Sequence, residues 1–174
     1  MSQPADDNSP AFGWARSIRA ANPSDLPAIL DLEQATPLAA HWSPEHYQRR
    51  IQSQPQAACF LVAESHGEED GQVCGFVCAR IVADEWEIEN IVVRQEFRRE
   101  GIGSQLMQAL IRNWKDAGGR ALLLEVRATN TAARTFYERQ RLREVGRRSA
   151  YYRDPTDDAI LYTLKRDEYL NSKW

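Results

Sequence analysis

Two arginines and two glycines stand close together in the middle of the chain, in the stretch Arg98-Arg99-Glu100-Gly101-Ile102-Gly103-Ser104. The apolar stretch Ile91-Val92-Val93 precedes it, and apolar residues at helical spacing follow it. Glycines at the start of a helix let backbone N–H groups and the positive helix end converge on one point with no Cβ in the way. The stretch therefore predicts an anion site, and its arginines suit a pyrophosphate. On these letters alone, the glycines can also serve only a tight turn from strand to helix.

Two common nucleotide-binding motifs are excluded by the residues around these glycines. A phosphate loop of the Gly-x-x-x-x-Gly-Lys-Ser/Thr type needs a lysine that is absent here. The dinucleotide fingerprint Gly-x-Gly-x-x-Gly/Ala needs a small third residue, where this chain has Leu106. Glu125 stands near the place of a ribose-binding acid, but the strands before the loop form a meander and too little chain remains for a substrate domain. We therefore exclude a Rossmann dehydrogenase.

The surrounding sequence predicts the elements that position this loop. Three strands are expected at residues 59–64, 72–82 and 85–93, close enough together for an antiparallel meander. A helix over residues 101–117 follows the loop, with apolar residues on one stripe. The further elements are a strand at 121–126, a helix at 130–140, and two last strands, at about 142–147 and 159–165, that enclose a polar aromatic loop.

Two short helices and a possible first strand at residues 18–20 precede the meander. The segment Ser43-Pro44-Glu45 predicts the start of the second helix, because it has a capping hydroxyl followed by a proline and an acid in the first turn. The whole order of elements predicts an α/β fold with a mixed sheet.

The loop and two later segments together resemble the GNAT acetyltransferases, whose acetyl-CoA loop reads Arg/Gln-x-x-Gly-x-Gly/Ala. Arg98 to Gly103 match that loop. Within the family, the chain is similar to the ribosomal-protein alanine N-acetyltransferases in several segments from about residue 18 to residue 164. These segments are Leu124-Glu125-Val126-Arg127-Ala128-Thr129-Asn130, Phe136-Tyr137-Glu138, Arg147-Arg148, Tyr151-Tyr152, Asp158-Ala159-Ile160 and, upstream, Trp42-Ser43-Pro44-Glu45. The resemblance implies a mostly antiparallel central sheet of about six to seven strands, flanked by about four helices.

The resemblance also implies how acetyl-CoA, the co-substrate, would be held. Backbone groups of Ile91 and Val93, with Val92 between them, would bind the pantetheine arm like an added strand. Asn130, at the start of a helix, would contact the cofactor arm as well. The pyrophosphate would lie on the loop formed by Arg98, Arg99, Glu100, Gly101, Ile102, Gly103 and Ser104.

Acetyl transfer from a thioester to an amine needs two proton movements. The acceptor α-amine, with a pKa near ~8, must lose a proton before it attacks, and the departing sulfur must be neutralised or stabilised. The resemblance implies Glu125 as the base and Tyr137 as the acid. No metal is expected, because the three histidines, His41, His46 and His66, are too scattered for metal-ligand spacing. The apolar run around Glu125 supports its role, because desolvation raises the pKa of a carboxyl and makes it a better base.

Each of these residues also has a purely structural interpretation. Glu125 can be an edge acid paired with Arg127 or Arg134. Tyr137 can pack in the core. Asn130 can cap the helix that follows it, which does not exclude contact with the cofactor.

Glu87 and Glu89 offer an alternative to Glu125. In a regularly alternating strand they share a face with Ile91 and Val93. They can replace or assist the base, attract a cationic amine, or simply form a solvated face.

Two further segments bear on the acceptor and on the fold. The loop from Arg147 to Asp158, with Tyr151 and Tyr152, would shape the acceptor groove. Where the family has a Leu-Gly-Phe turn, the residues at 138–142 contain no glycine. We therefore expect a reshaped end of the helix before the last two strands.

Length and composition limit the class of protein. The chain has 174 residues and a formal net charge of −3, which suit about one domain. We assign residues 1–15 to a flexible N-terminal tail and residues 16–174 to a single domain. The mildly acidic balance argues against bulk nucleic-acid binding.

Targeting signals and a disulfide framework are not expected. The longest apolar run, residues 57–63, is far below the roughly 18 to 20 residues of a membrane span. Residues 1–10 have no Lys or Arg and no apolar block, so we expect no secretory signal and a cytoplasmic protein. No two of the three cysteines form a Cys-x-x-Cys motif. We therefore expect Cys59, Cys74 and Cys78 to be buried thiols.

Three functional hypotheses follow. The first is an enzyme that acetylates the α-amine of a protein N-terminus, with alanine of a small-subunit ribosomal protein as the first candidate. The second is the same fold acting on a small-molecule amine, and the third is a non-catalytic acyl-CoA-binding protein. We expect a monomer or weak dimer in each case.

Overall fold

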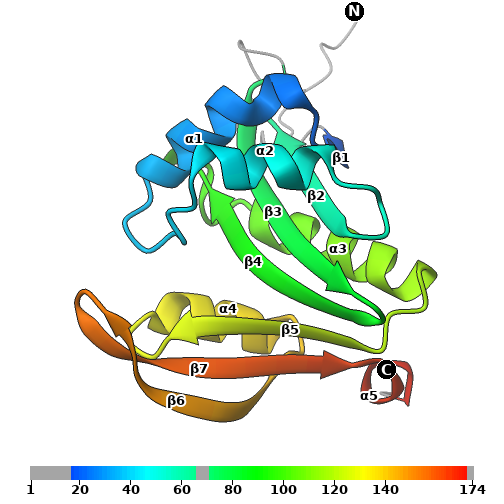
Figure 1. Ribbon diagram of the computed structural model, residues 1–174, viewed down its shortest axis with the longest axis vertical. Coiled ribbons are helices and arrows are strands. Elements are labelled where there is room, and N and C mark those ends of the chain that lie inside the picture. The colour runs from blue at the N-terminus through cyan, green and yellow to red at the C-terminus, as the bar shows by residue number, and fades with distance from the viewer. Residues whose placement is uncertain (1–16, 66–70, 172–174) are drawn as a thin grey trace, which may run out of the picture.

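The computed structural model describes residues 17–65 and 71–171, and the predicted tail, residues 1–15, lies outside them. Its strands form one seven-stranded sheet in the order β1-β2-β3-β4-β5-β7-β6 (Figure 1). Neighbouring strands are antiparallel except for β4 and β5, which are parallel. The predicted mixed, mostly antiparallel sheet is confirmed. The strands are β1 Ser17–Ala20, β2 Ala58–Glu64, β3 Val73–Val82, β4 Glu85–Val93, β5 Ala121–Arg127, β6 Arg143–Arg153 and β7 Thr156–Lys165.

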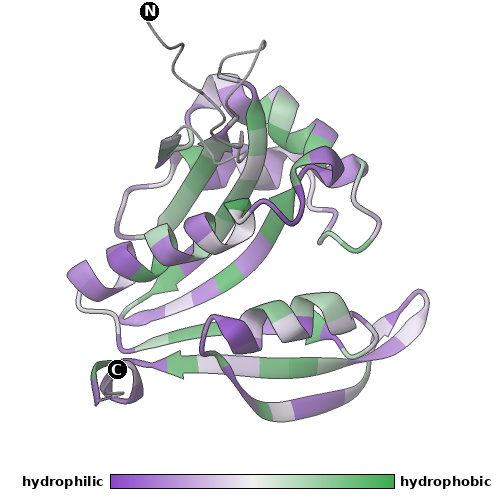
Figure 2. Ribbon diagram, turned by 180° about the vertical axis from the view of Figure 1, so that it is seen from behind, coloured by the Kyte–Doolittle hydropathy of each residue, from purple (hydrophilic) through white to green (hydrophobic). Residues whose placement is uncertain are grey.

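Helices cover both faces of the sheet. One face carries α1 and α2 across β2 to β4, whereas α3 and α4 lie on the opposite face, which Figure 2 shows from behind. Ser43 caps α2 as predicted, since its side chain accepts a hydrogen bond from the His46 amide. The short α5 was not predicted. The helices are α1 Leu26–Gln34, α2 Pro44–Gln52, α3 Ile102–Asp116, α4 Thr131–Arg139 and α5 Arg166–Asn171.

The buried side chains form two clusters, one on each face of the sheet. The larger lies between the sheet and the α3 and α4 helices and includes the whole predicted stripe of α3, from Ile102 to Trp114. The smaller lies beneath α1 and α2 and is built around Ile29, Tyr47 and Phe76. Apolar residues at helical spacing thus bury one face of each helix against the strands.

The β4 and β5 strands stay paired over a short distance only. Their ladder joins Glu85 with Ala121, Trp86 with Leu122, and Glu87 with Leu123, after which the two strands diverge (Figure 1). Both strands continue beyond this point, and each is paired there on its other side only. The divergence leaves two facing strand edges whose backbone groups are not paired with each other.

The end of α4 explains how the chain leaves the helix without a glycine. Arg141 adopts a φ of 69°, in the left-handed region that favours glycine. Its amide donates to the Glu138 carbonyl, and the Leu142 amide donates to the Tyr137 carbonyl at 3.1 Å. This is the Schellman pattern of helix termination. An arginine therefore does here what a glycine does in the family motif.

The last hairpin differs from its prediction. Tyr151 and Tyr152 do not lie in a loop, because β6 continues to Arg153. Between Arg148 and Tyr152, β6 has two residues more than the facing segment of β7. This irregularity bends the strand locally and re-aims its side chains.

The remaining predictions about composition concern thiols, metals and membranes. Cys59, Cys74 and Cys78 are buried and free, as predicted. Within residues 17–65 and 71–171, no three His, Cys, Asp or Glu side chains gather as a metal site. No helix in these same ranges is long and apolar enough to cross a membrane.

Candidate active site

The start of α3 presents unpaired backbone amides. Gly101 is the N-cap residue, with a φ of 83°, and no side chain caps the helix. The Gln105 amide is the first to find an acceptor in the helix, the Gly101 carbonyl at 3.0 Å. The amides of Ile102, Gly103 and Ser104 thus have no intrahelical acceptor, as at any helix start. Together with the positive end of the helix dipole, they make a cradle for an anion.

Two residues of this turn lie close to α4. A Cβ on Gly103 would lie 3.5 Å from the Phe136 ring, which is an ordinary contact distance. The Ser104 hydroxyl accepts a hydrogen bond of 3.2 Å from the Gln140 amide group. The start of α3 is therefore braced by α4, and Ser104 offers its backbone rather than its side chain to a ligand.

The charged residues of the loop differ in their contacts. The Arg98 guanidinium donates through Nε to the Val93 carbonyl at 3.0 Å and through Nη2 to the Thr36 hydroxyl at 3.4 Å. Arg99 has a φ of 71°, which helps the loop turn into the helix. One carboxylate oxygen of Glu100 is buried without a hydrogen-bond partner. Arg98 thus holds the end of β4 next to the cradle.

The edge of β4 that faces β5 carries backbone groups that point into the space between these two strands. The Arg94 amide donates to the Cys74 carbonyl, and Val92 stands opposite Phe76 in the same ladder. Because alternate residues of a strand direct their N–H and C=O groups to opposite sides, Ile91 and Val93 direct theirs away from β3. Of the three predicted residues, these two offer backbone groups to an extended ligand, while Val92 bonds to β3.

The two predicted catalytic residues lie on opposite faces of β5. Leu124 and Val126 belong to the cluster beneath α3 and α4, and Tyr137 of α4 belongs to it as well. Glu125, between them in sequence, points to the other face because side chains alternate along a strand. The structure thus brings both residues to the diverging part of β5, one on each side.

Glu125 is paired with residues of β6. Its Oε1 atom lies 3.0 Å from Nη1 of Arg148, and the Tyr151 side chain is near the same carboxylate. The negative charge of Glu125 raises the pKa of Tyr151. The arginines considered from the sequence are engaged elsewhere. Arg127 donates to the carbonyls of residues 154 and 155, and Arg134 donates to Tyr162 and Glu144.

Tyr137 is buried, and burial raises its pKa. Its ring packs beside Phe136 and Tyr162. Among the described residues, nothing hydrogen-bonds to its hydroxyl. The side chain is both part of the core and a protonated donor with no hydrogen-bond partner in residues 17–65 and 71–171. Asn130, two turns earlier, caps α4 by accepting from the Ala133 amide at 3.2 Å.

A bulge in β4 overturns the expected placement of Glu87 and Glu89. Cys78 pairs with Asn90 and Ala79 with Ile88, so that Glu89 has no opposite residue. The extra residue reverses the alternation, and Ile91 and Val93 join the cluster beneath α3. The two glutamates therefore lie on the face of α1 and α2, not on the face of Ile91 and Val93.

Glu89 is held by α2. The Arg50 guanidinium donates to both its oxygens at 2.6 and 2.5 Å, and Nε2 of His46 lies 3.4 Å away. Burial favours the neutral carboxyl, but the hydrogen bonds and charge of Arg50 outweigh it, so that the pKa of Glu89 is lowered. Glu87 is more exposed and pairs with Arg80.

A buried polar network beside Glu89 was missed from the sequence. The Tyr47 hydroxyl donates to Glu33 at 2.7 Å and accepts from Asn90 at 2.8 Å. The same oxygen of Glu33 accepts from the Trp42 amide, and the Trp42 ring stacks on His46. This network fixes the α1–α2 loop over the end of β4. No local pattern marks it, because its members come from three separate elements.

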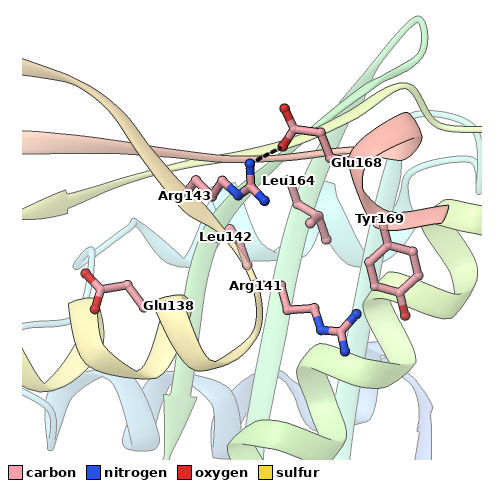
Figure 3. Close-up of a pocket in the computed structure, with 7 residues that line it drawn as sticks. All are labelled: Glu138, Arg141, Leu142, Arg143, Leu164, Glu168 and Tyr169. Carbon is pink, nitrogen blue, oxygen red and sulfur yellow. Dashed lines mark ion pairs between the residues drawn. The ribbon is translucent and has the colours of Figure 1, made fainter. Parts of the chain in front are cut away.

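A cavity of about 270 Å³ lies elsewhere, between the end of α4, the adjoining ends of β6 and β7, and α5 (Figure 3). Arg143 and Glu168 form an ion pair of 3.6 Å at its rim. None of the predicted site residues lines it. The predicted site residues therefore lie outside this cavity.

Comparison with known proteins agrees with this geometry. The profile of the acetyltransferase (GNAT) family matches residues 26–141. The chain is 31% identical over 150 residues to the [ribosomal protein bS18]-alanine N-acetyltransferase of Escherichia coli K12, covering 85% of this chain and 96% of that protein. It is 33% identical over 145 residues to the protein of the same name from Salmonella typhimurium, covering 81% and 91%.

Solved structures give the same picture. The crystal structure of the ribosomal-protein-S18-alanine N-acetyltransferase from Escherichia coli superposes with a TM-score of 0.72 at 30% identity, covering 86% of this chain and 92% of that one. Arabidopsis thaliana NAA60 in complex with acetyl-CoA superposes with a TM-score of 0.77 at 21% identity, covering 87% and 98%. The second likeness is one of fold alone.

Proposed function

Because this chain belongs to the acetyltransferase (GNAT) family, we propose that it transfers the acetyl group of acetyl-CoA to the α-amine of a protein N-terminus. The first candidate acceptor is the N-terminal alanine of a small-subunit ribosomal protein. The observation that carries this choice is the match, over 85% of the chain, to a protein named for that reaction. The cytosol, where ribosomes are made, is the setting that this function implies.

The residues present suit acetyl-CoA. The amides at the start of α3 suit the pyrophosphate, and the outward backbone groups of Ile91 and Val93 suit the amides of the pantetheine arm. The arm would run from the α3 and α4 side toward the divergence of β4 and β5. Asn130 stands beside that path at the start of α4.

The acceptor would approach from the opposite face, where Glu125 lies. Glu125 would take a proton from the α-ammonium, and the neutral amine would then attack the thioester carbon. On the other face, the protonated Tyr137 hydroxyl would donate its proton to the departing sulfur. The second proton, which the acceptor nitrogen loses as the amide forms, would pass to solvent, from which Tyr137 would be reprotonated. The separation of the two residues across β5 keeps each proton transfer on the side where its substrate lies.

The test is intact-mass analysis of synthetic peptides after incubation with acetyl-CoA. The panel holds one peptide with N-terminal alanine, the same peptide with other first residues, a form blocked at the α-amine that keeps a free lysine, and a polyamine. We expect a gain of one acetyl group on the free α-amine of the alanine peptide.

Three other outcomes would overturn the proposal in different ways. Acetylation of the polyamine in preference to every peptide would identify a small-molecule enzyme. Modification of the blocked peptide would identify a lysine acetyltransferase. Binding of acetyl-CoA with no product on any acceptor would indicate a non-catalytic protein.

A further inference from the structure

We propose that Arg148 is a positioning residue that occupies the Glu125 carboxylate until the acceptor α-ammonium replaces it. This inference rests on the proposed function, since it assigns Glu125 the role of base. It adds a residue of β6 that controls access of the amine to that base.

The contact is direct and accessible. Nη1 of Arg148 lies 3.0 Å from Oε1 of Glu125, and the side chains are 53% and 22% exposed respectively. The ring centre of Tyr151 lies 5.5 Å from the Arg148 guanidinium carbon, and the charge of the same carboxylate raises the pKa of the Tyr151 hydroxyl. Two neighbours on one strand thus converge on one acid from the side open to solvent.

The backbone of β6 is shaped to bring them there. The two additional residues between Arg148 and Tyr152 are accommodated by a left-handed turn at Ala150, with a φ of 50°. Asp158 of β7 holds this turn by accepting from the Ala150 amide at 2.7 Å. A regular strand would not place both side chains beside Glu125, because alternation would separate them.

The chemistry of the pair explains why it must open. A guanidinium donates hydrogen bonds but neither accepts nor releases a proton at ordinary pH. The oxygen bound by Arg148 is therefore unavailable to the acceptor while the pair lasts. The incoming α-ammonium carries the same charge and competes for the same oxygen.

The ion pair between Arg148 and Glu125 is weak enough for an acceptor to displace Arg148. An ion pair in which one side chain is half-exposed, as Arg148 is at 53%, rarely changes an equilibrium by more than about fivefold. The nearby pair of Glu89 with Arg50 is different, because both side chains are largely buried, at 9% and 20% exposure. An acceptor can therefore displace Arg148 from Glu125, whereas Arg50 remains a structural partner of Glu89.

A free Glu125 would also activate water. The water oxygen would bond to the acetyl carbon as Glu125 takes one of its protons, the C–S bond would break, and the sulfur would receive a proton to give acetate and the CoA thiol. By occupying Glu125 in the absence of acceptor, Arg148 would suppress this wasteful hydrolysis.

Steady-state kinetics of R148Q test the inference, with the N-terminal alanine peptide as acceptor. We expect the KM for the peptide to fall about two- to fivefold, the KM for acetyl-CoA to stay unchanged, and CoA release without peptide to rise. R148K keeps the charge and should behave like the parent. R143Q is the matched control, since Arg143 is an exposed arginine of β6 whose partner is Glu168.

Failure of this inference is distinguishable from failure of the proposed base. An unchanged or raised peptide KM in R148Q, with thermal unfolding like the parent, would overturn the role of Arg148. If E125Q is slow while R148Q is normal, Glu125 stays the base and only the inference fails. If E125Q turns over like the parent, the assignment of the base itself fails.

Discussion

The Glu125 carboxylate and the Tyr137 ring lie on opposite faces of the same strand, β5. The first faces solvent and the arginine of β6, and the second is enclosed with the apolar side chains beneath α3 and α4. The carboxylate and the hydroxyl are therefore in different surroundings, and β5 separates the proton acceptor from the proton donor. A proton acceptor on one side and a proton donor on the other suit a thioester that passes between β4 and β5.

Replacement of Glu125 by glutamine should slow transfer while acetyl-CoA still binds. The amide keeps the size of the carboxyl but cannot take a proton, and general base catalysis is worth about 10²- to 10⁴-fold. We expect kcat/KM for the peptide to fall by that order at neutral pH, with acetyl-CoA affinity by calorimetry unchanged. E87Q, which alters a more exposed acid on the same face, should stay within about twofold of the parent.

Replacement of Tyr137 by phenylalanine should lower kcat by roughly 10- to 100-fold. The loss is smaller than for the base because a thiol, with a pKa of about 8.5, already leaves as a thiolate with modest help. Stability to urea should hardly change, since the described structure gives the hydroxyl no partner to lose. A variant as active as the parent would show that the residue only packs in the core.

The pH profile should carry no alkaline limb from Tyr137 below about pH 10. Burial raises the pKa of its hydroxyl above the ordinary value of 10, so that the group stays protonated throughout the neutral and mildly alkaline range. The profile of kcat for the parent, measured from pH 6 to pH 10, checks this. A fall in kcat between pH 8 and 9 that disappears in Y137F would contradict it.

The two glycines of the loop should respond differently to alanine. Gly101 has a φ of 83°, and strain in the left-handed region costs an alanine about 1 kcal/mol. G101A should therefore lower both the free energy of unfolding and the affinity for acetyl-CoA, because the amides that follow are reoriented. G103A should leave both within about 0.5 kcal/mol of the parent, since its Cβ would meet Phe136 at an ordinary 3.5 Å. Equal losses in both variants would contradict this distinction.

The pair of Arg50 and Glu89 should contribute to stability in a pH-dependent way. The pKa of Glu89 is lowered below its usual value of 4.5, so its contribution is present above that pH and is lost as the pH falls through the lowered pKa. R50M leaves a largely buried carboxylate without its main partner, which should cost about 2 kcal/mol at pH 7. Because the acid is neutral in both proteins at low pH, the difference in urea unfolding should shrink below about pH 4.

The exposed pair of Arg80 and Glu87 supplies the control for that experiment. R80M removes the arginine of a pair whose acid, Glu87, also lies on β4, but whose side chains are 45% and 42% exposed. Such pairs are worth about 1 kcal/mol or less. A loss in R80M as large as in R50M would show that burial does not govern the difference.

Replacement of Arg141 by glycine should stabilise the protein by about 1 kcal/mol. The φ of 69° at this position is strained for arginine and relaxed for glycine. Thermal unfolding should shift upward by about 2 to 4 °C for a chain of this length. R139G, inside the helix, should shift it downward, and a downward shift in R141G would mean that the side-chain contacts of Arg141 outweigh the strain.

Elements with strong local patterns were predictable from the sequence. The stripe from Ile102 to Trp114 indicates α3, and Ser43 followed by Pro44 marks the start of α2, because periodicity and capping act over a few residues. The loop at Gly101 was located for the same reason. These signals fix the position of the loop at the start of α3.

Features that depend on pairing between distant strands were not predictable. The bulge at Glu89 depends on the pairing register between β3 and β4. It places the later residues of β4 on the face opposite to the one that regular alternation predicts. The partner of Glu125 is Arg148, which comes from β6 and is brought to it by the pairing of β6 with β7 and of β7 with β5. Neither spacing nor composition near Glu125 contains that information.

The short ladder between β4 and β5 has a mechanical consequence. The ladder holds three residue pairs, so we expect the two strands beyond Glu87 to separate more readily than the other neighbouring strands of the sheet. A ligand bound there would connect the two strands, since it would bond to backbone groups of β4 and β5 that are not paired with each other. Slower hydrogen exchange of the Ile91 and Val93 amides on addition of the co-substrate would be the signature of that closure.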